Sequence, residues 1–254
     1  PSLPFFSPDL GPAERRAHAA IVVDANSGRV LHAEDADGLR YPASLSKMMT
    51  LYLLFDAIEA GRFNLATPLV ASEEAASRPP AKLGLKPGET ITVDQAIRAM
   101  AVRSSNDVAV VVAEAVAGSE EAFARQMTGK ARALGMRRTR FVNASGLPDE
   151  RQVSTARDMA TLGRALMREH RRFAGYFTLK EWTYEGRRIR ATNKLLGEVP
   201  GAVSVRRGGR HVIAVVFGGR TGRARNETMK ALIERWVPEA GAPTPLAGIG
   251  AGGR

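Results

Sequence analysis

The stretch Tyr41-Pro42-Ala43-Ser44-Leu45-Ser46-Lys47-Met48-Met49 decides both the fold and the chemistry expected of this chain. A loop ends at Pro42 and a helix follows. Ser44 then lies on the first turn, where backbone N–H groups lack partners and the helix dipole favours negative charge. Lys47 follows three residues later, on the same face of the helix. Its amine can take the serine's proton, and a backbone N–H can receive the oxyanion of an acyl transfer.

A capped helix with a solvated lysine is the plainer interpretation, because Ser-x-x-Lys is a short pattern. The residues after Lys47 favour a buried helix instead, since apolar side chains follow on nearly every face: Met48, Met49, Leu51, Tyr52, Leu53, Leu54, Phe55 and Ile58. Burial lowers the pKa of an amine and makes it usable as a base. The run from Ser44 to Ile58 is well short of the ~20 residues that cross a bilayer.

Composition indicates an ordinary globular protein. The 254 residues allow one large or two modest domains, with 44% hydrophobic and 25% charged residues. There is no cysteine, which excludes disulfides and thiolate chemistry. The histidines lie far apart without metal-ligand spacing: His18, His32, His170 and His211. We therefore expect neither a metal nor a cofactor.

The charge is strongly basic. Lys and Arg number 37 against 26 Asp and Glu, which gives a net charge of +11. Such a charge suits nucleic acid, an anionic membrane or an anionic substrate. No helix-turn-helix, zinc-finger or RNP-type motif accompanies it, so nucleic-acid binding is the weaker interpretation. We expect the excess of Arg to steer an anionic substrate, with much of it on solvated surface.

The expected elements alternate between strands and helices. Strands are predicted at 19–24, 29–33, 177–184, 187–191, 203–205 and 211–217. Besides the helix that begins near Ser44 and ends near Gly61, helices are predicted at 92–102, 107–117, 119–135, 155–170 and 225–237, the first with a Thr92–Gln95 capping box. The expected domains are a sheet domain of 17–70 and 171–238, a helical insertion of 71–170, an N-terminal arm of 1–16 and a flexible tail of 239–254.

Ser104-Ser105-Asn106 interrupts an otherwise helical stretch. Taken alone, the triplet is typical of a helix end with Asn in a turn. It is, however, the only Ser-x-Asn in the chain, and it follows the Ser-x-x-Lys helix at a suggestive distance.

With these two motifs the chain resembles the serine-type D-alanyl-D-alanine carboxypeptidases, which are low-molecular-mass penicillin-binding proteins. The likeness extends from about Ala19 to Trp236. It includes Leu85-Lys86-Pro87-Gly88, Phe141-Val142-Asn143 with Ser145-Gly146-Leu147, Ser154-Thr155-Ala156-Arg157-Asp158-Met159 and Thr192-Asn193-Lys194-Leu195-Leu196. The fold expected is α/β (α+β): an antiparallel sheet covered by helices on both faces, with an inserted, mostly helical lobe.

The resemblance implies a role for each motif residue. Ser44 would be the acylated nucleophile and Lys47 its general base. Ser104 would relay a proton to the departing D-alanine, and Asn106 would bind the substrate's peptide and steady Lys47. The Ser44 backbone N–H would form half of the oxyanion hole. Partners would be peptidoglycan pentapeptide stems ending in D-Ala-D-Ala, and β-lactams as covalent inhibitors.

The family's third motif, Lys-Thr/Ser-Gly on an inner strand, is absent. Gly197 to Gly201 runs directly into Ala202-Val203-Ser204-Val205, which predicts a hairpin whose short first strand leaves the second half unpaired. Our hypothesis is that a segment is missing at about Gly201/Ala202, and a genuine deletion is the alternative. Arg220-Thr221-Gly222 resembles the motif, because Arg can replace Lys in binding a carboxylate. It falls too late in the chain, and we interpret it as the loop into the last helix.

The expected function is a D-alanyl-D-alanine carboxypeptidase of the periplasm or cell envelope. The alternatives are a DD-endopeptidase or β-lactamase on the same fold, or an impaired peptidoglycan-binding homologue if the third motif is truly absent. A β-lactamase is the weaker alternative, because the chain contains no Glu-x-x-Leu-Asn deacylation motif. The chain begins at Pro1 without a signal peptide, from which we expect a processed or trimmed form. The resembled family often has a further C-terminal domain and an amphipathic anchor, and we expect this stretch of sequence to stop short of both.

Overall fold

The computed structural model describes residues 17–191, 198–199, 202–218 and 221–241. Its centre is a five-stranded sheet in the order β2-β1-β9-β8-β7, with every neighbouring pair antiparallel. The strands are β1 (Ala19–Asp24), β2 (Val30–Glu34), β7 (Glu198–Val199), β8 (Ala202–Arg207) and β9 (Arg210–Phe217).

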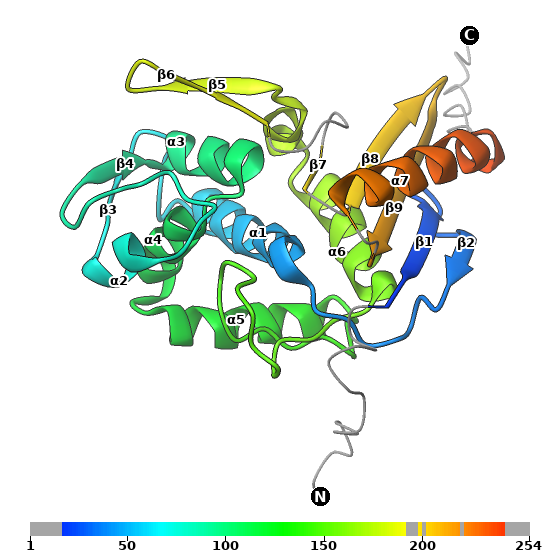
Figure 1. Ribbon diagram of the computed structural model, residues 1–254, viewed down its shortest axis with the longest axis horizontal. Coiled ribbons are helices and arrows are strands. Elements are labelled where there is room, and N and C mark those ends of the chain that lie inside the picture. Colours follow the sequence, from blue (N-terminus) through cyan, green and yellow to red (C-terminus); the bar gives the residue numbers. More distant parts are fainter. Residues whose placement is uncertain (1–16, 192–197, 200–201, 219–220, 242–254) are drawn as a thin grey trace, which may run out of the picture.

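Helices make up most of the remainder (Figure 1). They are α1 (Ser46–Glu59), α2 (Glu73–Ser77), α3 (Val93–Arg98), α4 (Asn106–Ala117), α5 (Glu120–Ala133), α6 (Ala156–Glu169) and α7 (Gly222–Trp236). Short helical turns occupy η2 (Ala43–Leu45), η3 (Ala99–Arg103), η4 (Arg171–Thr178) and η5 (Val237–Glu239). Two small hairpins pair β3 (Pro68–Val70) with β4 (Thr90–Thr92), and β5 (Glu181–Tyr184) with β6 (Arg187–Arg190). None of the described helices is long and apolar enough to cross a membrane.

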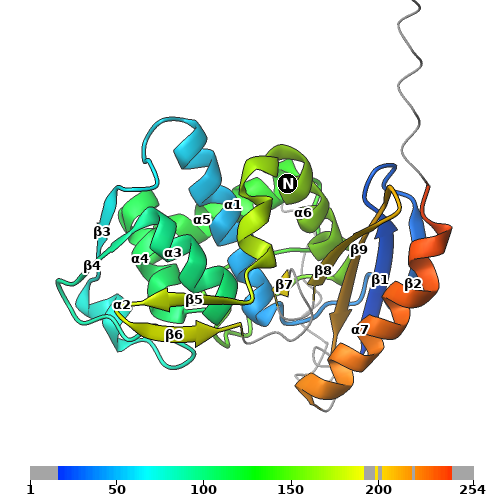
Figure 2. The ribbon, with the colours of Figure 1, turned by 90° about the horizontal axis from the view of Figure 1, so that it is seen from above.

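The two faces of the sheet are both apolar and both covered. Side chains alternate along a strand, so one strand supplies both faces. Ile21 and Ile213 point into the core shared with α1 and α6, whereas Val22 and Val212 point into a second core beneath α7. Figure 2 shows α6 and α7 on opposite sides of the sheet. The predicted antiparallel sheet with helices on both faces is thus confirmed.

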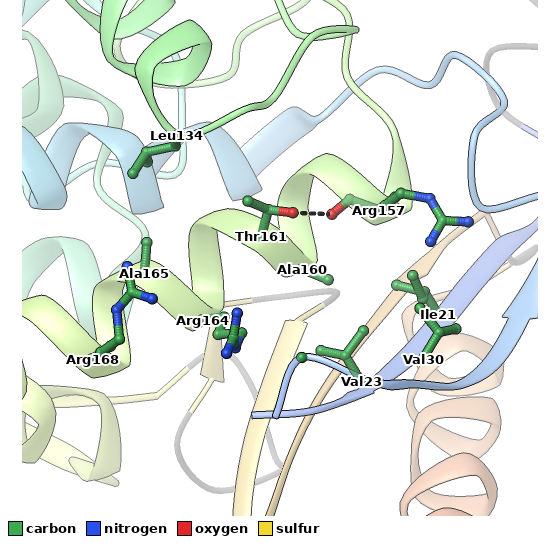
Figure 3. A pocket seen from close by; sticks show the side chains of 11 residues that line it. Ile21, Val23, Val30, Leu134, Arg157, Ala160, Thr161, Arg164, Ala165 and Arg168 are labelled. Carbon is green, nitrogen blue, oxygen red and sulfur yellow. Dashed lines mark hydrogen bonds between the residues drawn. The ribbon is translucent and has the colours of Figure 1, made fainter. Parts of the chain in front are cut away.

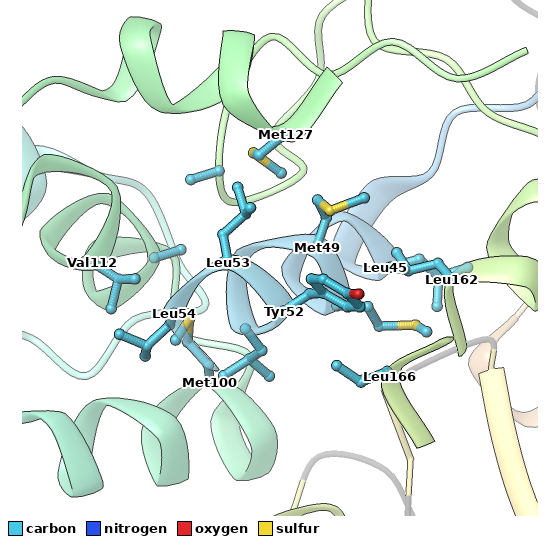
Figure 4. Packing of buried hydrophobic residues seen from close by; sticks show 14 of the residues in the cluster. Leu45, Met49, Tyr52, Leu53, Leu54, Met100, Val112, Met127, Leu162 and Leu166 are labelled. Atoms are coloured by element: carbon cyan, nitrogen blue, oxygen red, sulfur yellow. The ribbon is translucent and has the colours of Figure 1, made fainter. Parts of the chain in front are cut away.

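Helix α1 lies at the centre of the larger core. Met49, Leu51, Leu54 and Phe55 are fully buried, and the helix contacts α4, α5 and α6. Figure 4 shows its side chains meeting Val112 and Met127 on one side and Leu162 and Leu166 on the other. The burial that the apolar run predicts is confirmed.

The predicted helix ends agree with the structure at several places. Thr92 and Gln95 form the capping box before α3. Ser119 caps α5, since its side chain accepts a hydrogen bond from the Ala122 N–H. Gly118 ends α4 in the left-handed conformation that glycine adopts without strain.

Three predicted boundaries need correction. Phe177 and Thr178 belong to the helical turn η4, not to a strand, because Phe173 and Phe177 both pack on Phe55 at a helical spacing. The last helix begins at Gly222, three residues earlier than predicted, because the Thr221 side chain caps it. The hairpin before it is not lopsided, since all six residues of β8 pair with β9.

The strand pairing also cuts across the expected domain boundaries. Strand β3 pairs with β4 of the helical lobe, and β6 contacts η3 of that lobe. Helix α6, predicted within the insertion, packs instead on the main sheet. The division into domains therefore stays a prediction.

The two ends of the chain fall largely outside the described residues. The predicted arm, residues 1–16, lies outside them, as does most of the predicted tail. The first residues of that tail are ordered against the sheet: Ala240 is buried, and the Gly241 N–H donates to Asp24. These contacts place residues 240 and 241 against the sheet, and the flexible tail stays a prediction.

Candidate active site

Ser44 lies on the turn that leads into α1. The turn η2 precedes the helix, and its N-cap residue Pro42 provides no side-chain cap. Ala43 has φ +47°, an unusual conformation for a residue other than glycine. Ser44 itself is half-buried. Within the described residues its hydroxyl makes no hydrogen bond, so the oxygen is not committed to another group.

Lys47 lies one helical turn further on and is almost completely buried, with 1% of its surface exposed. Its Nζ donates to Asn106 Oδ1 at 2.8 Å and to the Ser145 carbonyl at 2.5 Å. Burial lowers the pKa of Lys47, and the nearby negative charge of Asp107 opposes this shift. Burial is the larger effect, so the pKa falls to about 7. The amine is therefore available as a base near neutral pH.

The Ser104-Ser105-Asn106 motif meets α1 from the other lobe. Ser104 ends the π-helical turn η3 in a left-handed conformation with φ +58°. Its hydroxyl is buried and has no partner among the described residues. Asn106 begins α4, and its Nδ2 donates to the Pro79 carbonyl at 2.9 Å. The structure thus brings Lys47 and Asn106 into direct contact across 59 residues of sequence.

Asp107 holds the loop beside this motif. Its carboxylate accepts hydrogen bonds from the backbone N–H groups of Leu83, Gly84 and Leu85, at 3.0, 2.8 and 3.2 Å. The Asn106 N–H donates to the Ala81 carbonyl at 2.7 Å. These contacts fix residues 81–85 against the start of α4.

The loop from Asn143 to Leu147 covers the Ser44 turn. Asn143 Oδ1 accepts from the Gly146 N–H at 2.8 Å and so shapes the loop. A Cβ added at Gly146 would lie 1.8 Å from the Ala43 carbonyl oxygen and 3.0 Å from the Ser44 nitrogen. Only glycine fits at this approach, and Gly146 also has φ +85°.

The sequence did not predict that Asp107, the Ser145 carbonyl and Gly146 would contact the candidate site. The stretch Ser145-Gly146-Leu147 carries part of the family resemblance, but a main-chain acceptor has no side-chain signature. Asp107 adjoins Asn106 and acts through its charge and its backbone contacts. No cluster of His, Asp and Glu side chains in the described part of the chain could hold a metal ion.

The strands in which the third motif was expected do not contain it. Strand β7 lies at the edge of the sheet beside β8, and Val199 pairs with Ala202. Neither strand carries a lysine. The proposed junction involves Gly201, which lies outside the described residues, as does Arg220 of the Arg220-Thr221-Gly222 triplet. The flanking strands pair directly with only residues 200 and 201 between them.

An antiparallel sheet beside a helical lobe, with a Ser-x-x-Lys helix facing a Ser-x-Asn turn, is the arrangement of the DD-peptidase and β-lactamase class of proteins. The comparisons with known proteins narrow this class. The profile of the D-alanyl-D-alanine carboxypeptidase family matches residues 8–209. The chain belongs to this family, and the resemblance stated from its motifs is confirmed.

Two curated relatives show the extent of the likeness. The D-alanyl-D-alanine carboxypeptidase DacF of Bacillus subtilis is 32% identical over 238 residues, which cover 86% of this chain and 61% of DacF. The D-alanyl-D-alanine carboxypeptidase DacA of Escherichia coli is 36% identical over 240 residues, which cover 85% of this chain and 60% of DacA. The chain thus spans about three fifths of the length of these relatives.

Solved structures agree on the fold. Penicillin-binding protein 5 from Haemophilus influenzae superposes with a TM-score of 0.81 at 28% identity, over 87% of this chain and 70% of that one. Penicillin-binding protein D2 from Listeria monocytogenes, in its ampicillin-bound form, gives 0.72 at 27% identity, over 85% and 95%.

Proposed function

We propose that this chain is a D-alanyl-D-alanine carboxypeptidase that removes the terminal D-alanine from peptidoglycan stem peptides. One observation carries the proposal: the amine of Lys47 is buried, has a pKa of about 7 and is held by Asn106 one helical turn from Ser44. A lysine in that state is a base rather than a surface charge. Membership of the carboxypeptidase family supports the same activity.

The hydrogen bonds of Lys47 suit it to accept a proton. A neutral amine has two N–H donors and one lone pair. Both donors are occupied, one by Asn106 Oδ1 and one by the Ser145 carbonyl. The lone pair is left for the proton of Ser44, whose hydroxyl has no other partner in the described part of the chain.

The proposed reaction follows from this arrangement. Ser44 Oγ attacks the carbonyl carbon of the penultimate D-alanine while its proton passes to Lys47. The Ser44 N–H stabilises the oxyanion. The C–N bond then breaks, and Ser104 relays a proton to the departing D-alanine nitrogen. Water hydrolyses the acyl-enzyme and regenerates the Ser44 hydroxyl.

Ser104 and Asn106 are assigned roles that match their surroundings. The Ser104 hydroxyl is buried without a partner, so a substrate or leaving group can supply one. Asn106 Oδ1 fixes Lys47, while its Nδ2 donates one hydrogen to Pro79 and keeps a second for the substrate's peptide.

The proposed cellular location and the proposed inhibitors are inferred from membership of the family. The Listeria protein D2 was crystallised with ampicillin and with cefotaxime, which supports covalent capture of β-lactams by Ser44 here. Peptidoglycan stems are the proposed partners, and the bacterial periplasm or cell envelope is the proposed location.

Labelling with a fluorescent penicillin tests the assignment. We expect a covalent adduct with the parent protein and none with Ser44→Ala. Slow release of the label supports a carboxypeptidase, whereas rapid turnover would indicate a β-lactamase. A DD-endopeptidase would be recognised by cleavage of cross-linked rather than pentapeptide stems. A parent protein that is not labelled but still binds peptidoglycan would overturn the proposed activity and indicate an impaired homologue. The absence of the Lys-Thr/Ser-Gly motif is the feature that favours this alternative.

A further inference from the structure

A cavity of about 590 Å³ opens beside the Ser104–Asn106 turn. Its walls are the loop residues Lys82 and Leu83, the end of η3 at Arg103, and the whole of strand β6. We call these seven lining residues (Lys82, Leu83, Arg103 and 187–190) the basic groove. Its size falls within the range of ligand sites.

The charge of the basic groove is only partly neutralised. Five of its seven lining residues are Lys or Arg, and none is acidic. Arg188 is paired with Glu181 at 2.6 Å, and Arg187 lies 3.9 Å from Glu185. Arg103 and Arg190 form no ion pair with any described residue, although both are exposed. The groove therefore presents free positive charge to a ligand.

The shape of the groove suits an extended chain. Successive residues of a strand point to opposite faces, yet 187, 188, 189 and 190 all line the cavity. The cavity therefore runs along the edge of β6, and not over one face. In the described sheet β6 pairs only with β5, which leaves this edge open. A strand edge of this kind binds extended peptides through main-chain hydrogen bonds.

The groove is continuous with the candidate active site. Arg103 directly precedes Ser104, and the Leu83 N–H donates to Asp107, the residue after Asn106. A peptide whose C-terminal end lies at Ser44 can thus extend past the second motif towards β6.

We propose that the basic groove binds carboxylates on the part of the peptide substrate remote from the scissile bond. This inference rests on the proposed function and adds a preference for acidic over amidated stem peptides. Arg103 and Arg190 are the specificity-determining residues, because they form no ion pair with a described residue, whereas the Lys82 amine already donates to the Ala76 carbonyl.

Another cavity, formed by described residues elsewhere in the fold, lacks this property. It measures about 340 Å³ and lies between α6 and the first hairpin of the sheet, where Figure 3 shows Arg157, Arg164 and Arg168 on the helix facing Val23 and Val30. All three arginines have acceptors already: Arg157 binds Asp37, Arg164 binds two main-chain carbonyls, and Arg168 binds Glu169. Their presence alone does not make a free anion site.

Peptide binding to the Ser44→Ala protein tests the proposal without requiring turnover. Two fluorescent peptides with the same D-Ala-D-Ala end are compared by anisotropy, one with free side carboxylates and one with carboxamides. We expect the acid form to bind about three- to tenfold more tightly at low salt, with a smaller difference at high salt. In the Ser44→Ala background, Arg190→Glu should abolish this preference and leave the affinity for the amide form unchanged.

Arg132→Glu, introduced in the same background, is the matched control. Arg132 is also an exposed arginine, and it lies on α5, away from the hairpin (Figure 1). This variant should keep the full preference for the acid peptide. Equal binding of the two peptides, or an equal loss in Arg132→Glu and Arg190→Glu, would overturn the inference. Penicillin labelling of the otherwise unmodified Arg190→Glu protein should equal that of the parent, so failure of the groove and failure of Ser44 chemistry are distinguished.

Discussion

Lys47 Nζ and Asn106 Oδ1 form a 2.8 Å hydrogen bond that joins the central helix α1 to the first turn of α4. The contact is buried, since Lys47 is 1% and Asn106 6% exposed. It links the two sequence motifs directly, so the position of the Lys47 amine depends on the Asn106 side chain.

The charge state of Lys47 predicts how acylation depends on pH. Because burial lowers its pKa to about 7, the neutral amine forms as the pH rises through 7. The second-order rate of penicillin labelling should therefore increase from about pH 6 to pH 8 and then level off. Lys47→Arg keeps a positive charge that is not lost, so it should label about 10²- to 10⁴-fold more slowly. A parent profile that is flat between pH 6 and 8 would contradict this role.

Removing the charge of Asp107 should move that profile. The carboxylate stabilises the protonated form of Lys47 and raises its pKa. In Asp107→Asn the amine should lose its proton more readily, so the labelling limb shifts to lower pH. Asp94→Asn removes a carboxylate that pairs with Arg98 instead and should leave the limb in place. A shift towards higher pH in Asp107→Asn would show that the charge does not act on Lys47.

Gly146→Ala should displace the turn that carries Ser44, the proposed nucleophile. The new Cβ would lie 1.8 Å from the Ala43 carbonyl oxygen, so either loop or turn must move. We expect slower labelling and a loss of at least ~1–3 kcal/mol in the free energy of unfolding. Gly61→Ala is the control, because it has φ +74° but no atom within 4 Å of the added Cβ. It should lose only the stability that a positive φ costs alanine, and it should be labelled like the parent. Equal labelling rates in the two variants would contradict the close approach of Gly146 to Ala43.

His211 should make the fold sensitive to acid. Burial, together with the nearby Arg206 charge, lowers its pKa to about 4. The unfolded chain, with an ordinary His pKa near ~6.5, then binds more protons than the folded one between these values. The free energy of unfolding should fall as the pH drops from about 6.5 to 4, by on the order of 1 kcal/mol per pH unit.

Urea denaturation at a series of pH values measures this effect. His211→Gln should flatten the dependence, although it also alters the 2.7 Å hydrogen bond to Ser204 and lowers stability at every pH. His18→Gln changes an exposed histidine and should preserve the slope of the parent. An unchanged slope in His211→Gln would assign the acid sensitivity to other groups.

Local sequence signals predicted much of this fold because they act over a few residues. The apolar run after Lys47 predicted a buried helix, and Thr92 with Gln95 predicted the start of α3. Phe177 was misplaced because Phe55, the ring that it meets edge-on, lies far away in the sequence. A tertiary contact of that kind overrides the preference of an aromatic residue for strands.

The candidate site was predictable only in its side-chain motifs. Ser44, Lys47, Ser104 and Asn106 stand in recognisable patterns, and the structure brings Lys47 and Asn106 together. The Ser145 carbonyl was not predictable, because every residue has one and only the fold decides which faces an amine.

Helix α1 carries the proposed nucleophile's neighbour Lys47 and is also the middle of the main core, enclosed by α4, α5 and α6. We expect its amide hydrogens to exchange with solvent only when the surrounding helices separate, as they do in global unfolding. Loss of penicillin labelling on heating should therefore coincide with loss of the whole fold, and no partially open, inactive form should precede it.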